Sequence, residues 1–63
     1  MSMAMFMMEQ RVVIVENEDE KLRNRKATVV KINYDGSALA RVDGSRSERV
    51  TGRTIWPEDC DPI

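Results

Sequence analysis

The basic side chains are the residues of this chain whose type and spacing suggest chemistry. Residues 21–53 hold nine of the ten Lys and Arg residues and only three of the eleven acidic residues, so this stretch carries a net charge of +6. The flanks on both sides are acidic, and the overall charge of −1 hides this arrangement. Segregated positive charge attracts phosphate groups, so the pattern favours a binding module.

Six basic residues and one tyrosine form the predicted nucleic-acid-binding set. We expect the loops and turns that carry the basic residues to converge on one rim, where they would contact RNA or DNA phosphates without reading sequence. An aromatic ring at an exposed turn would offer a stacking surface for a base. The alternative is a solubilising surface whose cations pair with the acidic residues 16–20. The set consists of Arg23, Arg25, Lys26, Arg46, Arg49, Arg53 and Tyr34.

A protein partner is the second hypothesis for this chain. The Met-rich residues 1–9 read as an apolar arm that packs on a partner or on a second copy, because methionine adapts to irregular surfaces. Alternatively, several Met codons crowd the start and translation begins at Met7 or Met8. An adaptor or inhibitor would also use an outer face of the predicted hairpin. That face carries Val29, Lys31, Leu39 and Arg41.

The chain lacks the residues that most catalytic and metal sites require. It has no histidine and one cysteine, so a Ser or Cys nucleophile has no histidine base and no zinc site can form. Acidic neighbours raise the pKa of the Cys60 thiol, which makes it inert. Glu58, Asp59 and Asp61 match no known cation-binding loop. We therefore expect no catalytic activity, cofactor or metal, although an enzyme whose site forms between the subunits of an oligomer stays a third alternative.

Short β-branched runs separated by turn residues predict an all-β fold. A strand is expected over residues 10–16. The charged residues 16–26 are expected to form an exposed loop that tucks Leu22 inward, with a helical turn as the alternative. A polar turn over residues 44–48 and a short strand over 49–51 come next. A last strand or turn over 54–56 brings in Trp56, which we expect to plug the core; the alternative is an exposed ring on which a base stacks. The residues after Pro57 are expected to be loose unless Ile63 packs back.

The segment from Lys26 to Asp43 predicts a hairpin around Asp35-Gly36. A two-residue turn would split the apolar residues between both faces. A three-residue loop pairs Asn33 with Ser37 and places Gly36 in a left-handed bulge position. The side-chain pattern selects this second register. It puts Thr28, Val30, Ile32, Ala38, Ala40 and Val42 on one face and Val29, Lys31, Asn33, Leu39 and Arg41 on the other.

The segment from Arg11 to Trp56 resembles the SH3-like small barrels, particularly the KOW and Tudor-type modules of bacterial proteins. The resemblance rests on the runs Val12–Val15, Ala27–Val30, Tyr34–Gly36, Ala40–Gly44 and Ile55–Pro57. It implies a barrel of four to five antiparallel strands that binds RNA, DNA or a protein tail. One position differs, because KOW modules usually carry a glycine before the second strand and this chain has Arg25-Lys26-Ala27.

These patterns divide the chain into an arm over residues 1–9, a barrel over 10–57 and an acidic tail over 58–63. Sixty-three residues are enough for one small domain, whose core must be apolar packing because a single cysteine makes no internal disulfide. No apolar run approaches the length of a membrane span. The lack of a secretion signal and of a disulfide framework favours the cytoplasm.

Overall fold

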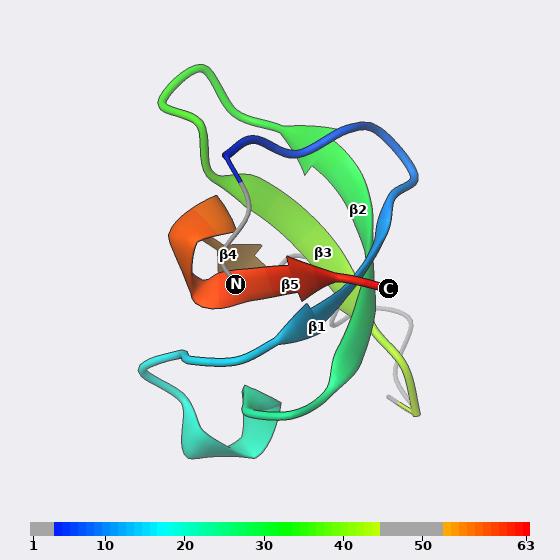
Figure 1. Ribbon diagram of the computed structural model, residues 1–63, viewed down its shortest axis with the longest axis vertical. Coiled ribbons are helices and arrows are strands. Elements are labelled where there is room, and N and C mark those ends of the chain that lie inside the picture. The colour runs from blue at the N-terminus through cyan, green and yellow to red at the C-terminus, as the bar shows by residue number, and fades with distance from the viewer. Residues whose placement is uncertain (1–3, 45–52) are drawn as a thin grey trace.

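The protein folds into one curled β-sheet, which a computed structural model describes for residues 4–44 and 53–63. Five antiparallel strands form the sheet (Figure 1). Their order across it is β4 (Arg53–Ile55), β3 (Ala38–Val42), β2 (Lys26–Ile32), β1 (Arg11–Ile14) and β5 (Cys60–Pro62). The curled sheet encloses the core on its inner side. This confirms the predicted all-β class and is consistent with a small SH3-like barrel.

β1 (Arg11–Ile14) lies between β2 and β5 in the sheet and falls inside the predicted range 10–16. Its β-branched residues suit the pleated backbone of a strand. Successive side chains point to opposite faces, so Val12 and Ile14 enter the core while Arg11 faces solvent. β1 pairs with β2 (Lys26–Ile32) on one side and with β5 (Cys60–Pro62) on the other.

The core is one apolar cluster that collects small side chains from all five strands. Burial of Leu22 confirms that the first loop folds inward at this residue, within a 3₁₀-helix at Glu20–Leu22. The side chain of Asp19 caps this helix by accepting a hydrogen bond of 3.0 Å from the Lys21 amide. The cluster consists of Phe6, Val12, Ile14, Leu22, Ala27, Val29, Ala38, Ala40, Val42, Ile55 and Cys60.

The tip of the hairpin between β2 and β3 (Ala38–Val42) has the predicted three-residue loop. The Asn33 amide donates a hydrogen bond of 2.8 Å to the Ser37 carbonyl, and Ile32 pairs with Ala38. Gly36 has a φ of +93°, a left-handed value that a Cβ atom would disfavour. The Asp35 carboxylate accepts hydrogen bonds from the Ser37 amide and hydroxyl and so closes the turn.

Further along the hairpin, a β-bulge at Val30 changes the register. Lys31 pairs with Leu39, but Val29 pairs with Ala40, so Val30 is an extra residue in β2. Val29 is therefore fully buried, whereas Val30 is 38% exposed. The expected faces are wrong for Val29 and Val30, because the regular pairing we assumed from the turn stops at the bulge. The prediction is also wrong for Thr28, which pairs with exposed Arg41 and lies on the outer face.

The C-terminal residues form part of the barrel, and the expectation of a loose tail is wrong. β4 (Arg53–Ile55) is followed by a 3₁₀-helix at Pro57–Asp59, which leads into β5. β5 pairs along β1 and brings Cys60 opposite Ile14 in the core. Residues 60–62 thus supply the fifth strand.

The N-terminal segment packs on its own barrel through one aromatic side chain. Phe6 is buried in the core, while Met5, Met7 and Met8 stay exposed. Two backbone hydrogen bonds of 2.9 Å, from the Glu9 amide to the Val29 carbonyl and from the Val29 amide to the Gln10 carbonyl, attach this segment to β2. The turn expected over 44–48 and the strand expected over 49–51 lie outside the described residues, apart from Gly44.

Candidate nucleic-acid interface

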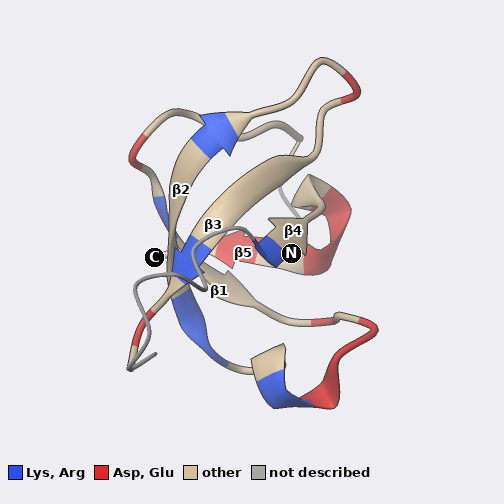
Figure 2. Ribbon diagram, turned by 180° about the vertical axis from the view of Figure 1, so that it is seen from behind, with Lys and Arg blue, Asp and Glu red and all other residues tan. Residues whose placement is uncertain are grey.

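Four basic side chains gather on the outside of β1, β2 and β3. Arg11 pairs with Thr28, which in turn pairs with Arg41, so these residues form one row across three strands. Lys26 lies in the adjacent row, opposite Val13. Figure 2 shows basic residues on these strands, with acidic residues grouped on the first loop and ahead of β5. We call the group Arg11, Arg25, Lys26 and Arg41 the cationic face; all four residues are exposed.

Asp43 lies at the centre of the cationic face. Arg11 holds its carboxylate with two hydrogen bonds, Nη1 to Oδ1 at 2.8 Å and Nη2 to Oδ2 at 2.6 Å. The hydrogen bond from Arg11 lowers the pKa of Asp43, and the positive charges of Arg11, Lys26 and Arg41 lower it further. The same pair raises the pKa of Arg11. One carboxylate therefore interacts with three cations, and the cationic face keeps a net positive charge.

Arg25 is anchored beside this group by the turn that follows β3. Its Nη2 donates a hydrogen bond of 2.7 Å to the Asp43 carbonyl. Gly44 has a φ of +79°, and a Cβ atom at this position would lie 2.9 Å from Arg25 Nη2. The positive φ favours glycine at this position, and a larger residue would displace the tip of the Arg25 side chain.

The residues of the predicted rim divide between two places. Arg25 and Lys26 lie on the cationic face, whereas Arg23 and Arg53 lie against the acidic first loop. Arg23 Nε is 3.1 Å from Glu16 Oε1 and also donates to the Asn17 carbonyl. Arg53 Nη1 is 3.9 Å from Asp19 Oδ2.

The remaining predicted residues are not brought to the cationic face. Tyr34 is fully exposed at the hairpin tip, as expected for a loop tip. This tip lies at the opposite end of β2 from Lys26, and a seven-residue strand spans about 23 Å. Arg46 and Arg49 lie outside the described residues.

The predicted protein-docking face is also changed by the bulge. Val29 was expected on this face, but it is fully buried in the core. Leu39 is half-buried, and Lys31 opposite it is exposed. Arg41 belongs to the cationic face instead. The apolar surface that we expected beside the two cations is therefore small.

Arg11 is the residue of the cationic face that the sequence analysis missed. Alternation along the first strand would have shown it, because Val12 and Ile14 must point inward and Arg11 therefore points outward. Alternation along one strand does not show which strand pairs with it. Only the pairing of Arg11 with Thr28 places its guanidinium next to the hairpin.

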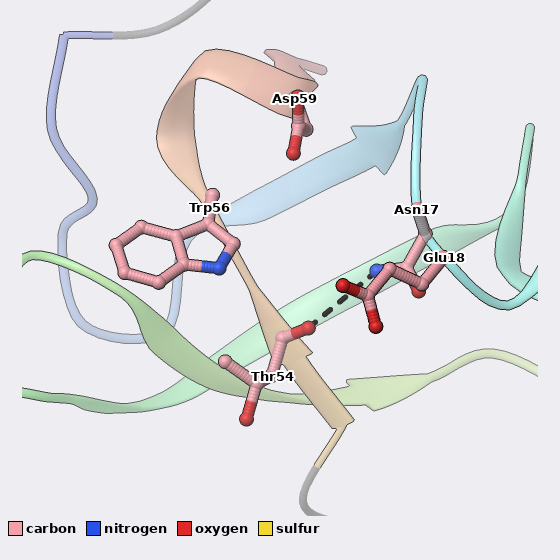
Figure 3. A pocket seen from close by; sticks show the side chains of 5 residues that line it. All are labelled: Asn17, Glu18, Thr54, Trp56 and Asp59. Atoms are coloured by element: carbon pink, nitrogen blue, oxygen red, sulfur yellow. Dashed lines mark hydrogen bonds between the residues drawn. The ribbon is translucent and has the colours of Figure 1, made fainter.

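A pocket of about 270 Å³ opens between the first loop and the C-terminal part of the barrel (Figure 3). Trp56 forms one wall and is 39% exposed. The prediction that Trp56 plugs the core is wrong, because Ile55 is the buried residue of this pair. The pocket is lined by Asn17, Glu18, Thr54, Trp56 and Asp59.

Comparisons with known proteins place this chain in no family. No family model, curated protein or solved structure matches it.

The described residues offer little for nucleophilic or metal chemistry. Cys60 is buried, and burial together with Asp59 and Asp61 raises the pKa of its thiol to about 11. Residues 4–44 and 53–63 contain no group of three or more His, Cys, Asp or Glu side chains that could hold a metal ion. In the same part of the chain no helix is long and apolar enough to cross a membrane.

Proposed function

We propose that this protein is a non-catalytic module that binds the phosphates of RNA or DNA through its cationic face. The observation that carries the proposal is the grouping of Arg11, Lys26 and Arg41 around the single carboxylate of Asp43. Arg25 adds a fourth cation at the same turn. Like charges repel, so a group of cations with one counter-charge is stabilised by an anionic ligand.

The geometry of the face suits a phosphate backbone rather than base edges. Arg11 and Arg41 lie on strands that flank β2, and neighbouring strands are about 4.8 Å apart. The backbones of these two strands are therefore about 10 Å apart on a convex surface. The Arg11 guanidinium reaches across β2 to Thr28 and Asp43, on the side of the face where Arg41 lies. Contacts of this kind position nucleic acid without sequence specificity.

The proposal is tested by the salt dependence of binding to labelled duplex DNA and single-stranded RNA. Each phosphate contact contributes about 0.9 to the slope of log affinity against log salt for duplex DNA. The double variant Lys26→Gln with Arg41→Gln should lower affinity at low salt and reduce the slope by about two contacts. The matched control, Lys21→Gln with Lys31→Gln, removes the same charge elsewhere and should keep the slope. The proposal would be contradicted if both double variants lost the same affinity for nucleic acid, or if the wild-type protein did not bind at low salt.

A protein-interaction role is the second candidate, and the exposed methionines favour it. Met5, Met7 and Met8 are 71%, 68% and 57% exposed, although Phe6 between them is buried. The hydrogen bonds between this segment and Val29 bring it next to exposed Val30. Such a surface suits a second copy or another apolar partner. Sedimentation of the wild-type protein and of a Met7→Gln, Met8→Gln variant distinguishes a dimer from a monomer.

A further inference from the structure

The pocket beside Trp56 is separate from the cationic face and carries the opposite charge. Its walls come from the first loop, from β4 and from the 3₁₀-helix at Pro57–Asp59. Among the described residues that line it, Glu18 and Asp59 are acidic. In Figure 3 the indole turns the edge that carries its nitrogen toward Glu18 and Asn17. The site therefore combines an aromatic surface with carboxylates.

Hydrogen bonds between distant parts of the chain hold these walls in place. The amides of Val15 and Glu16 donate to the Asp59 carbonyl at 2.8 and 3.1 Å. The Asp59 amide in turn donates to the Trp56 carbonyl at 3.0 Å. Across the pocket, Asn17 Nδ2 donates to the Thr54 carbonyl at 3.5 Å (Figure 3). A pocket formed before its ligand arrives loses less entropy on binding.

The carboxylates near the pocket differ in whether the chain itself supplies a cation. Glu16 pairs with Arg23 and Asp19 lies near Arg53, so this loop already binds guanidinium groups twice. Among the described residues, no ion pair joins Glu18 or Asp59 to a Lys or Arg side chain. These two carboxylates face the pocket next to the exposed indole. A cation from outside the chain would complete the same kind of pairing.

We propose that this pocket binds an arginine side chain of a protein partner. A guanidinium is planar, so it can stack on the Trp56 indole while its edge donates to a carboxylate. A lysine ammonium lacks the planar fork and is more strongly hydrated, which makes it the weaker ligand. The protein would then hold a basic polypeptide on one side and nucleic acid on the other.

Intrinsic fluorescence tests the proposal directly, because Trp56 is the only tryptophan of the chain. The probes are three short capped peptides in which arginine, lysine or citrulline stands between glycines. The arginine peptide should change the emission of Trp56 saturably. The citrulline peptide keeps the shape but not the charge and should bind at least about tenfold more weakly. Equal binding of both peptides, or no response to arginine, would overturn the proposal.

Variants of the pocket supply the matched controls. Glu18→Gln and Asp59→Asn should each weaken binding of the arginine peptide by about tenfold or more, as expected for loss of a charged hydrogen bond. Glu20→Gln removes the same charge from the same loop outside the pocket and should leave peptide binding unchanged. Circular dichroism confirms that each variant is folded. If Glu20→Gln weakens binding as much as Glu18→Gln, the attraction is diffuse and the pocket assignment is wrong.

The two proposals fail independently of one another. Glu18→Gln should leave DNA affinity unchanged at physiological salt, because the loop is then screened from the cationic face. The Lys26→Gln, Arg41→Gln variant should bind the arginine peptide as the wild type does. If the protein binds the arginine peptide but not DNA, only the proposed nucleic-acid role is wrong. If it binds DNA but not the arginine peptide, only the proposed arginine site is wrong.

Discussion

At the scale of single residues, the arginines of this protein differ in their partners. Arg23 and Arg53 lie against carboxylates of the first loop. Arg41 and Lys26 share Asp43 with Arg11, which already holds that carboxylate with two hydrogen bonds. Exposed ion pairs contribute little to stability, so these pairings matter mainly for which cations can meet a ligand. Residue type alone does not give that distinction.

Cys60 gives a test at the same scale. Its thiol is buried, and burial, followed by the charges of Asp59 and Asp61, raises the pKa to about 11. At pH 8 the native thiol should therefore react with iodoacetamide roughly two orders of magnitude more slowly than the thiol of urea-unfolded protein. The measurement is the alkylation rate followed by mass spectrometry. Equal rates in the two states would show that Cys60 is accessible.

The same shift predicts a loss of stability in alkali. The pKa of the Cys60 thiol is raised in the folded state. Its contribution to the free energy of unfolding is therefore fully present below the pKa of the thiol in the unfolded chain, about 8.5. It is lost progressively as pH rises from there to about 11. A Cys60→Ala variant should lack this part of the pH dependence in urea titrations.

At the scale of elements, the bulge in β2 decides which valine belongs to the core. A regular strand alternates strictly, and the pairing set at the hairpin tip would place Val30 inside and Val29 outside. The extra residue reverses both positions. Bulges also increase local twist, which helps a short sheet to curl.

A pair of substitutions separates the bulged register from the regular one. Val29→Asp should prevent folding, because it buries an unpaired carboxylate in a small and marginally stable domain. Val30→Asp should fold and lose at most about 1 kcal/mol, as is usual for exposed positions. Circular dichroism and urea unfolding of both variants make the comparison. The reverse ranking would mean that β2 pairs regularly with β3 and that the bulge is absent.

At the scale of the whole molecule, the two charged regions are close enough to influence one another at low salt. The principal extents are 29, 21 and 20 Å. The Debye length is about 30 Å at 0.01 M salt but about 8 Å at 0.15 M. The acidic loop and the 3₁₀-helix at Pro57–Asp59 therefore repel a phosphate ligand only when salt is low.

This reasoning predicts a salt-dependent gain of affinity. The variant Glu20→Gln with Glu58→Gln removes two exposed acids outside the cationic face. It should bind duplex DNA several-fold more tightly than the wild type at about 0.01 M salt and equally at about 0.15 M. Fluorescence anisotropy at both salt concentrations measures the difference. A gain that persists at the higher concentration would mean that one of these acids contacts the DNA.

Local patterns were enough to predict much of the barrel. The β-branched run of residues 12–15 predicted β1, and the Asp35-Gly36 turn predicted the hairpin and its loop length. A lone large apolar residue in a charged loop predicted that Leu22 turns inward. These signals depend on neighbours in the sequence, so they can be read without knowing the partner strand.

Tertiary structure alone decided the rest. Cys60–Pro62 has no strong strand propensity and becomes β5 because it pairs with β1, far away in the sequence. The Val30 bulge depends on how two strands curve together, for which a single sequence has no local signal. The cationic face and the Trp56 pocket likewise join residues from separate strands and loops. The sequence determined which side chains are present and most of the strands, whereas long-range pairing determined which of them meet.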